Sequence, residues 1–203
     1  MVDLLQYERL VSQSGCRYIA GIDEAGRGPL AGPVVVAGVV MPLEPGLLIA
    51  EVNDSKKLSE KKREKLYPLI LERALDVQVA VIDEKTIDEI NILNATKLGI
   101  KQCIEGFEMV DHVLIDAVKI DSQVPATSII HGDALSYSIA AASIVAKVTR
   151  DHLMKQYAQE YPVYMFEKHK GYGTAEHIKL LKQYGPCKIH RKTFIGHFVE
   201  VEL

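Results

Sequence analysis

Apolar and polar residues alternate with two different periods along this chain, and these periods predict a mixture of strands and helices. Short runs rich in Val and Ile, bounded by Gly, Pro or Asp, are typical of strands. Such runs cover residues 18–23, 33–41, 77–83, 112–117 and 127–130. A glycine-rich turn separates the first two runs, which favours an antiparallel hairpin there.

Helical periodicity fills most of the remaining chain. The predicted helices cover residues 3–13, 59–74, 86–107, 134–161 and 174–184. Ser59 is placed to cap the second of these helices, and the segment "TIDE" at 86–89 fits a capping box for the third. Small residues at 140–143 allow the long fourth helix to approach a sheet closely. Strands first, and then alternating helices and strands, predict an α/β domain with a mixed sheet.

Four carboxylates lie at the ends of these apolar segments. Asp23 and Glu24 interrupt the first apolar run, Asp116 ends a later strand, and Asp133 precedes the long helix. A buried carboxylate without a partner is costly, and Arg27 is the basic residue that follows the first pair. Hard cations such as Mg²⁺ take carboxylate oxygens as ligands. The pattern therefore suggests a divalent-metal site.

Each acid also has a purely structural interpretation. Asp133 is well placed to cap the long helix, Asp116 could begin a turn, and adjacent acids at a strand end are often solvated. Strand alternation places Asp23 on one face of the sheet and Glu24 on the other, unless the glycine turn bends the backbone. Spacing alone leaves both kinds of interpretation open.

Composition narrows the class of protein without identifying a partner. The 203 residues are 48% hydrophobic and 25% charged, as expected of a globular chain. The net charge of −3 argues against a nucleic-acid binder, since such proteins are often basic. Basic clusters nevertheless occur at 56–65, 167–173 and 188–192. Each cluster fits a solvated face, and together they permit a polyanionic ligand.

Cysteine use and hydropathy indicate the compartment. Cys16, Cys103 and Cys187 are odd in number and far apart, which disfavours a disulfide framework and favours a reducing environment. The first ten residues lack the features of a secretory signal, and the apolar runs are too short for a membrane span. We therefore expect a cytoplasmic protein that does not enter membranes.

Five long segments resemble one known family. They are "GIDEAGRGPLAGPVVVAGVV", "DSKKLSEKKREKL", "LIDAV", "GDALSYSIAAASIVAKVTRD" and "HKGYGT", in this order. Together they are similar to the type 2 ribonucleases H, specifically bacterial ribonuclease HII, over about residues 18–194. The resemblance implies a ribonuclease H-like fold with a five-stranded mixed sheet flanked by helices. It also implies cleavage of the RNA strand of RNA–DNA hybrids and incision at single ribonucleotides in duplex DNA.

The same resemblance assigns roles to individual residues. The family's catalytic and metal-binding acids match Asp23, Glu24, Asp116 and Asp133. Recognition of the ribonucleotide 2′-hydroxyl matches backbone groups of Gly26, Arg27 and Gly28, together with Tyr172. Lys56 and Lys57 lie in a family segment near the nucleic-acid backbone. The "GYG" segment could instead be only a turn before a helix capped by Thr174.

The resemblance also sets expectations for the whole protein. Two Mg²⁺ or Mn²⁺ ions per active site would support hydrolysis that leaves 3′-hydroxyl and 5′-phosphate ends. The partners would be RNA–DNA hybrids and ribonucleotide-containing duplex DNA, in replication and ribonucleotide excision repair. We expect one catalytic domain over residues 1–203, with the segment from about 174 to 203 packed on it, acting as a monomer.

Two rival functions have to be considered. One is a metal-dependent nuclease or transposase of the same broad fold with a different substrate. The other is a catalytically silent module that binds RNA–DNA hybrids. The presence of all four acids counts against the silent module, since binding alone does not need them.

Overall fold

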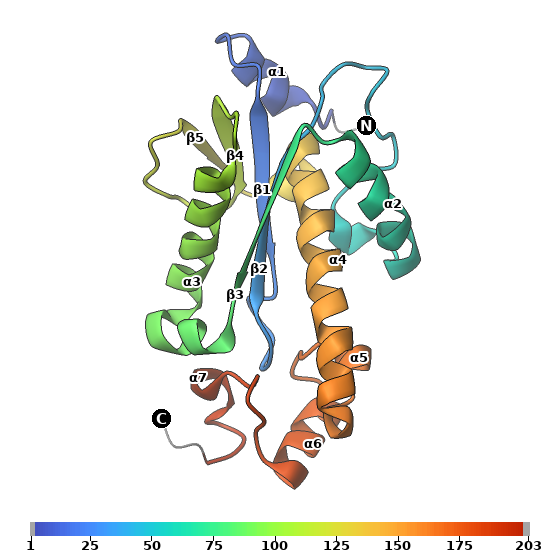
Figure 1. Ribbon diagram of the computed structural model, residues 1–203, viewed down its shortest axis with the longest axis vertical. Coiled ribbons are helices and arrows are strands. Elements are labelled where there is room, and N and C mark those ends of the chain that lie inside the picture. Colours follow the sequence, from blue (N-terminus) through green and yellow to red (C-terminus); the bar gives the residue numbers. More distant parts are fainter. Residues whose placement is uncertain (1–2, 201–203) are drawn as a thin grey trace.

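A five-stranded sheet with the order β3-β2-β1-β4-β5 forms the centre of the molecule (Figure 1). This computed structural model describes residues 3–200. The strands are β1 (Ile19–Ala25), β2 (Val34–Val40), β3 (Asp76–Ile82), β4 (His112–Asp116) and β5 (Ala126–Ile129). The predicted antiparallel pairing of β1 with β2 is confirmed. β3 is antiparallel to β2, and β4 is parallel to both β1 and β5, so the predicted mixed sheet is confirmed as well.

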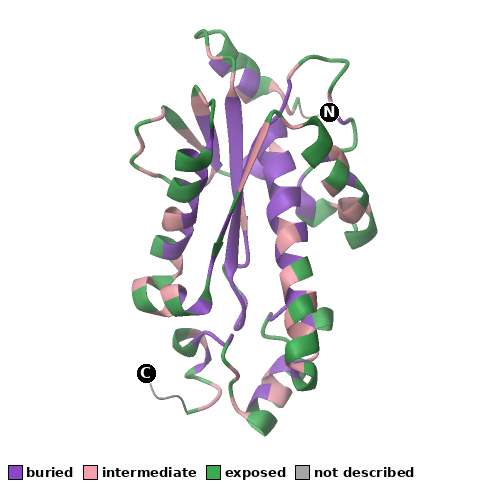
Figure 2. Cartoon of the chain, viewed as in Figure 1, coloured by how far each residue is buried: buried purple, intermediate pink, exposed green. Residues whose placement is uncertain are grey.

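Helices cover both faces of this sheet (Figure 1). Helix α3 (Glu84–Gly106) packs on β2 and β3, and helix α4 (Tyr137–Glu160) packs on β1 and β2 from the other side. The burial pattern follows these layers, because β2 is buried along its whole length and α3 and α4 bury the sides that face the sheet (Figure 2). The smaller helix α2 (Glu60–Arg73) packs beside α4, whereas α1 (Gln6–Ser12) contacts β1.

The contact between α4 and β1 depends on small residues, as the sequence predicts. Ala140, Ala141 and Ala142 are fully buried in the core between α4 and the sheet. On β1, a Cβ atom added to Gly21 would lie only 2.0 Å from the carbonyl carbon of Ser138. Glycine is therefore required at this position, and the close approach places the start of α4 against β1 two residues before Asp23.

Of the five predicted helix starts, two are correct and three are wrong. Helix α1 begins at Gln6 rather than at residue 3. Ser59 caps α2 and Thr174 caps helix α6 (Ala175–Tyr184), as predicted. The capping box at 86–89 is wrong, because Asp83 is the N-cap of α3 and accepts a hydrogen bond from the Thr86 backbone N–H at 2.9 Å. Helix α4 begins at Tyr137 rather than at residue 134, because Ser136 provides its cap.

The segment after α4 contains two short helices that periodicity does not predict. They are α5 (Phe166–His169) and α7 (Lys192–Ile195), each of four residues. Leu30 packs against Leu181 of α6 and Ile195 of α7, so this segment lies against the loop that follows β1. The three cysteines are free, as expected. None of the helices within residues 3–200 has the length and apolar character that a membrane span requires.

Candidate active site

The register of two parallel strands brings the first acids together. Ile22 of β1 pairs with Ile115 of β4, so Asp23 and Asp116 are the next residues at the carboxyl ends of adjacent strands. In open α/β sheets this edge is where ligands usually bind. Asp23 is buried, and one of its carboxylate oxygens accepts a hydrogen bond from the Glu24 backbone N–H at 2.7 Å.

A tight turn brings the third acid to the same edge. Asp133 lies in a 3₁₀ turn, η2 (Gly132–Ala134), and is buried. The Gly132 backbone N–H donates to Asp116 Oδ1 at 2.7 Å, which ties this turn to the end of β4. The structural interpretation of Asp133 as the cap of α4 is wrong, because Ser136 Oγ accepts the Ile139 backbone N–H instead.

Three carboxylates consequently face one another. Asp23, Asp116 and Asp133 each offer one oxygen, and these three oxygens all lie within 4.8 Å of one another. Glu24 is outside this group of three, as strand alternation predicts, but it lines the same cavity as Asp23 and Asp116. We call these four residues the acid cluster.

The electrostatics of the acid cluster are unfavourable without a cation. Burial, and then the negative charges of Glu24 and Asp116, raise the pKa of Asp23 well above its usual value. Burial also raises the pKa of Glu24 and the pKa of Asp116. Carboxylates in this arrangement favour a bound divalent cation, since it would neutralise them and accept their oxygens as ligands. The residues present therefore fit a metal site.

Two cations lie beside the acid cluster. The Lys56 ammonium donates to Asp133 Oδ2 at 2.8 Å, and Arg27 lies 3.4 Å from Glu24 Oε1. Burial opposes the charge on Lys56, but the hydrogen bond to Asp133 and the negative charges of Asp133, Asp23 and Asp54 together outweigh it and raise the pKa of this lysine. Lys57, predicted together with Lys56, pairs instead with Asp54 at 3.7 Å and is not among the residues that line the cavity.

The predicted sugar-recognition segment forms one wall of the cavity. Gly26, Arg27, Gly28 and Tyr172 line a space of about 230 Å³ that is also lined by three of the acids, Asp23, Glu24 and Asp116. Gly26 has φ +101°, and a Cβ atom there would lie 2.1 Å from Arg150 Nε. Glycine is therefore needed both for the backbone conformation and for the packing.

Tyr172 is partly exposed in the same wall. Its ring lies beneath the Arg150 guanidinium, whose central carbon is 5.8 Å from the ring centroid. Thr174 does cap α6, as the turn interpretation requires. The residues after Tyr172 therefore start a helix, while Tyr172 itself lines the cavity, and its role in sugar recognition stays a prediction.

Two buried arginines that sequence reasoning missed hold this wall in place. Arg191 donates to the carbonyl oxygens of Gly26, Arg27 and Gly32 at 2.6–3.0 Å. Arg150 donates to the carbonyl oxygens of Ala31, Pro33 and Lys170 at 2.9–3.1 Å. The basic cluster at 188–192 was expected to be a solvated face, but Arg191 within it is fully buried.

A chain of histidines supports the Tyr172 backbone. His177 Nδ1 donates to the Tyr172 carbonyl at 2.9 Å, which leaves its Nε2 to accept from His190 Nε2 at 3.1 Å. His190 Nδ1 in turn accepts the Cys187 backbone N–H at 3.0 Å. His169 donates to the Tyr164 carbonyl and accepts the Gly171 N–H. We call Arg150, Arg191, His169, His177 and His190 the support cluster.

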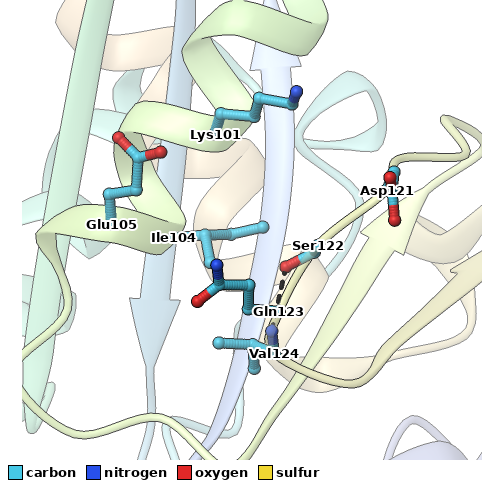
Figure 3. Close-up of a pocket in the computed structure, with 7 residues that line it drawn as sticks. All are labelled: Lys101, Ile104, Glu105, Asp121, Ser122, Gln123 and Val124. Atoms are coloured by element: carbon cyan, nitrogen blue, oxygen red, sulfur yellow. Dashed lines mark hydrogen bonds between the residues drawn. The ribbon is translucent and has the colours of Figure 1, made fainter.

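Cavity size alone does not identify the site. A larger cavity, of about 360 Å³, lies between α3 and the loop before β5 (Figure 3). Lys101, Ile104 and Glu105 line it from α3, and the opposite wall is residues 121–124. Its two acids lie on opposite walls and do not converge as the acid cluster does (Figure 3).

Comparison with known proteins agrees with this geometry. The family model described as ribonuclease HII matches residues 20–197. The ribonuclease HII of Ruminiclostridium cellulolyticum is 55% identical over 97% of this chain and 77% of its own length. That of Caldicellulosiruptor saccharolyticus is 55% identical over 96% and 95%. That of Bacillus subtilis is 50% identical over 95% and 75%.

Solved structures show the same fold. Ribonuclease H2 from Pyrococcus horikoshii superposes with a TM-score of 0.70 at 27% identity, over 86% of this chain and 92% of that one. The ribonuclease HII in a PCNA complex from Archaeoglobus fulgidus gives 0.77 at 25% identity, over 91% and 98%. A ribonuclease HIII called Bst-RNase HIII, solved in complex with Mn²⁺, gives 0.62 at 17% identity, over 83% and 63%.

Proposed function

This chain belongs to the ribonuclease HII family, whose members hydrolyse RNA in RNA–DNA hybrids, and we propose that it also incises duplex DNA 5′ to single embedded ribonucleotides. The products would carry 3′-hydroxyl and 5′-phosphate ends. The observation that carries the proposal is the convergence of three carboxylates, two buried and one half-buried, beside a cavity that a glycine-flanked backbone and a tyrosine also line.

The acid cluster would supply the ligands of the catalytic metals. Two Mg²⁺ or Mn²⁺ ions bound there would activate the attacking water and stabilise the leaving oxygen of an in-line displacement at phosphorus. Asp23 and Asp116 project from adjacent paired strands, and the Gly132 hydrogen bond fixes the turn that carries Asp133. Rigid elements of this kind hold catalytic groups more accurately than free loops do.

Sugar recognition would come from the cavity wall that Gly26, Arg27, Gly28 and Tyr172 form. The backbone of Gly26, Arg27 and Gly28 can approach a ribose edge closely because two of these residues have no side chain. A 2′-hydroxyl is both a donor and an acceptor, and it is the group that distinguishes RNA from DNA. The Tyr172 ring would pack on the neighbouring sugar, since tyrosine combines an apolar face with a polar hydroxyl.

Phosphate contacts would come from lysines near the rim. Lys56 lines the cavity, whereas Lys57 on the same turn faces Asp54. We therefore propose a direct phosphate contact for Lys56 and a weaker electrostatic role for Lys57. We also retain the proposal of a single catalytic domain acting as a monomer, which sedimentation of the purified protein would test.

Cleavage of a defined duplex tests the proposal. Purified protein is incubated with Mg²⁺ or Mn²⁺ and an end-labelled DNA duplex that contains one ribonucleotide, beside an all-DNA duplex and a continuous RNA–DNA hybrid. We expect incision 5′ to the ribonucleotide, cleavage of the hybrid and no cleavage of the all-DNA duplex. Cleavage of the all-DNA duplex would favour the rival nuclease. Binding without any cleavage would favour the silent module.

A further inference from the structure

The exposed Lys56 forms a direct ion pair with the acid cluster. Lys56 Nζ lies 2.8 Å from Asp133 Oδ2. The Lys56 side chain is 75% exposed, whereas the Asp133 side chain is 5% exposed. Separating this pair by moving the lysine into solvent therefore costs less free energy than moving the aspartate, because the aspartate is buried in the protein.

The backbone beneath Lys56 is firmly held. Asp54 accepts the Lys56 backbone N–H at 2.8 Å, and the Ser55 N–H donates to Ser143 Oγ of α4 at 3.2 Å. Arg63 donates to the carbonyl oxygens of Ser55 and Leu58 at 2.9 and 2.6 Å. Lys56 thus extends an exposed ammonium group from a backbone that hydrogen bonds hold in place. It is 77 residues away in sequence from the aspartate that it contacts.

The charge of Lys56 reaches the other acids as well. Burial raises the pKa of Glu24 and of Asp116, and the positive charge of Lys56 works against both rises. Asp23 in turn attracts the Lys56 ammonium. Lys56 therefore partly neutralises the acid cluster in the metal-free protein.

We propose that Lys56 is a resident counter-cation that a divalent metal ion must displace from Asp133, so that this lysine lowers the metal affinity of the free protein. The inference rests on the proposed metal-binding role of the acid cluster and extends it to a group outside the ligand set. Two cations that favour the same carboxylate compete, and removing one of them strengthens the binding of the other.

The exposure of the Lys56 side chain sets the expected change in metal affinity when this lysine is removed. An ion pair with one exposed partner contributes modestly to stability and weakens with salt. Removing the competitor should therefore tighten metal binding by about two- to tenfold rather than by orders of magnitude. Lys57 provides a matched control, because it lies on the same turn, carries the same charge and pairs with Asp54 instead.

Calorimetric titration with MnCl₂, at low ionic strength and without nucleic acid, measures this competition. We expect Lys56→Met to bind Mn²⁺ about two- to tenfold more tightly than wild type, whereas Lys56→Arg and Lys57→Met stay within about twofold of it. The melting temperature gives a second measurement. Metal-free Lys56→Met should melt below wild type, and Mn²⁺ should raise its melting temperature by more.

The outcomes separate this inference from the function on which it rests. Unchanged or weaker Mn²⁺ binding by Lys56→Met, with Asp116→Asn clearly weakened, would overturn the counter-cation role alone. Mn²⁺ binding that Asp116→Asn leaves unchanged would overturn the proposed metal site together with this inference. If Lys56→Met and Lys57→Met bind Mn²⁺ more tightly by the same factor, the change in affinity depends only on net charge. That result would also overturn the specific counter-cation role of Lys56.

Discussion

The acid cluster and the support cluster both bury ionisable side chains, and both adjoin the loop that follows β1. In the support cluster, Arg150 and Arg191 each donate three hydrogen bonds to backbone carbonyl oxygens. The histidines pair with each other and with the backbone. In the acid cluster, three carboxylate oxygens face one another, and the charged partners are Lys56, which pairs with Asp133, and Arg27, which pairs with Glu24.

The two clusters shift pKa values in ways that fit different roles. Burial lowers the pKa of His177 and of His190 to about 4, so both are neutral at pH 7 and need no counter-ion. Burial and like charges raise the pKa of Asp23, so its ionised form is destabilised in the folded protein. Buried groups whose hydrogen bonds are complete support a structure, whereas buried charge without a full complement of partners indicates a ligand site.

The largest predicted difference between the two clusters is that a substitution in the acid cluster should lower the cleavage rate. Asp116→Asn keeps the shape of the side chain but removes a ligand charge, and a metal site contributes several kcal/mol to transition-state stabilisation. We expect the cleavage rate to fall by about a hundredfold or more at saturating metal, with substrate binding nearly unchanged. Asp121→Asn, in the exposed loop after β4, is the control and should keep wild-type activity. If Asp116→Asn retains more than about a tenth of the wild-type rate, Asp116 is not a working ligand.

The support cluster should respond mainly in stability. Arg191→Gln leaves carbonyl oxygens of Gly26, Arg27 and Gly32 without their donors, and buried unsatisfied groups cost about 1–3 kcal/mol each. We expect a loss of about 2–4 kcal/mol in the free energy of unfolding, measured with urea. Lys188→Gln, at an exposed position of the same basic segment, should cost less than about 0.5 kcal/mol. Equal losses in the two variants would mean that the Arg191 hydrogen bonds contribute nothing specific.

Tyr172 lies where the two clusters meet and should affect selectivity. Tyr172→Ala removes a group expected to contact the sugar, at a cost on the order of 1–3 kcal/mol, or about five- to a hundredfold in rate. The loss of kcat/KM should be larger for a single embedded ribonucleotide than for a continuous hybrid, where many registers offer a 2′-hydroxyl. The control is Tyr184→Ala, at the end of α6, which should leave the ratio of kcat/KM for the two substrates unchanged. An unchanged ratio in Tyr172→Ala as well would make Tyr172 a turn residue only.

The smallest predicted effect is a gain in stability. The folded-state pKa of Asp23 is raised, so its contribution to stability is present at low pH and is lost as the pH rises through that pKa. Asp23→Asn removes the charge but keeps an oxygen that can accept the Glu24 N–H. At neutral pH the metal-free variant should melt about 2–4 °C above wild type, which corresponds to roughly 1 kcal/mol. The gain should shrink as the pH falls towards 4, and a gain of equal size at pH 7 and pH 4 would contradict this explanation.

The sequence predicts the acid cluster better than the support cluster, for physical reasons. The acids interrupt or end apolar runs, and the unusual position of a charge in such a run is visible locally. Arg150 is a charged residue on a helix face whose other members, Ser143 and Ala146, are small, so its unusual position is visible in the sequence but less clearly than that of the acids. Arg191 gives none, because its partners are 159–165 residues away and exist only in the folded chain.

Helix caps show a related limit of local patterns. Asp83 and Thr86 both fit a cap, as do Asp133 and Ser136, and the sequence does not decide between neighbouring candidates three residues apart. Tertiary contacts decide in the second case. Ser136 Oγ also donates to the buried carboxylate of Glu8 at 2.6 Å, and the Gly132 N–H is held by Asp116. Helix α4 therefore starts after the turn that carries Asp133.

The pH dependence of metal-induced stabilisation tests most directly whether unneutralised charge in the acid cluster creates the metal site. The melting temperature is measured with and without saturating Mn²⁺ at about pH 5 and about pH 8, for wild type and Asp116→Asn. The stabilisation of wild type should grow as the pH rises, because ionised carboxylates bind the metal, and it should be nearly absent in Asp116→Asn. Stabilisation that is equal at the two pH values, or that persists undiminished in Asp116→Asn, would contradict the account.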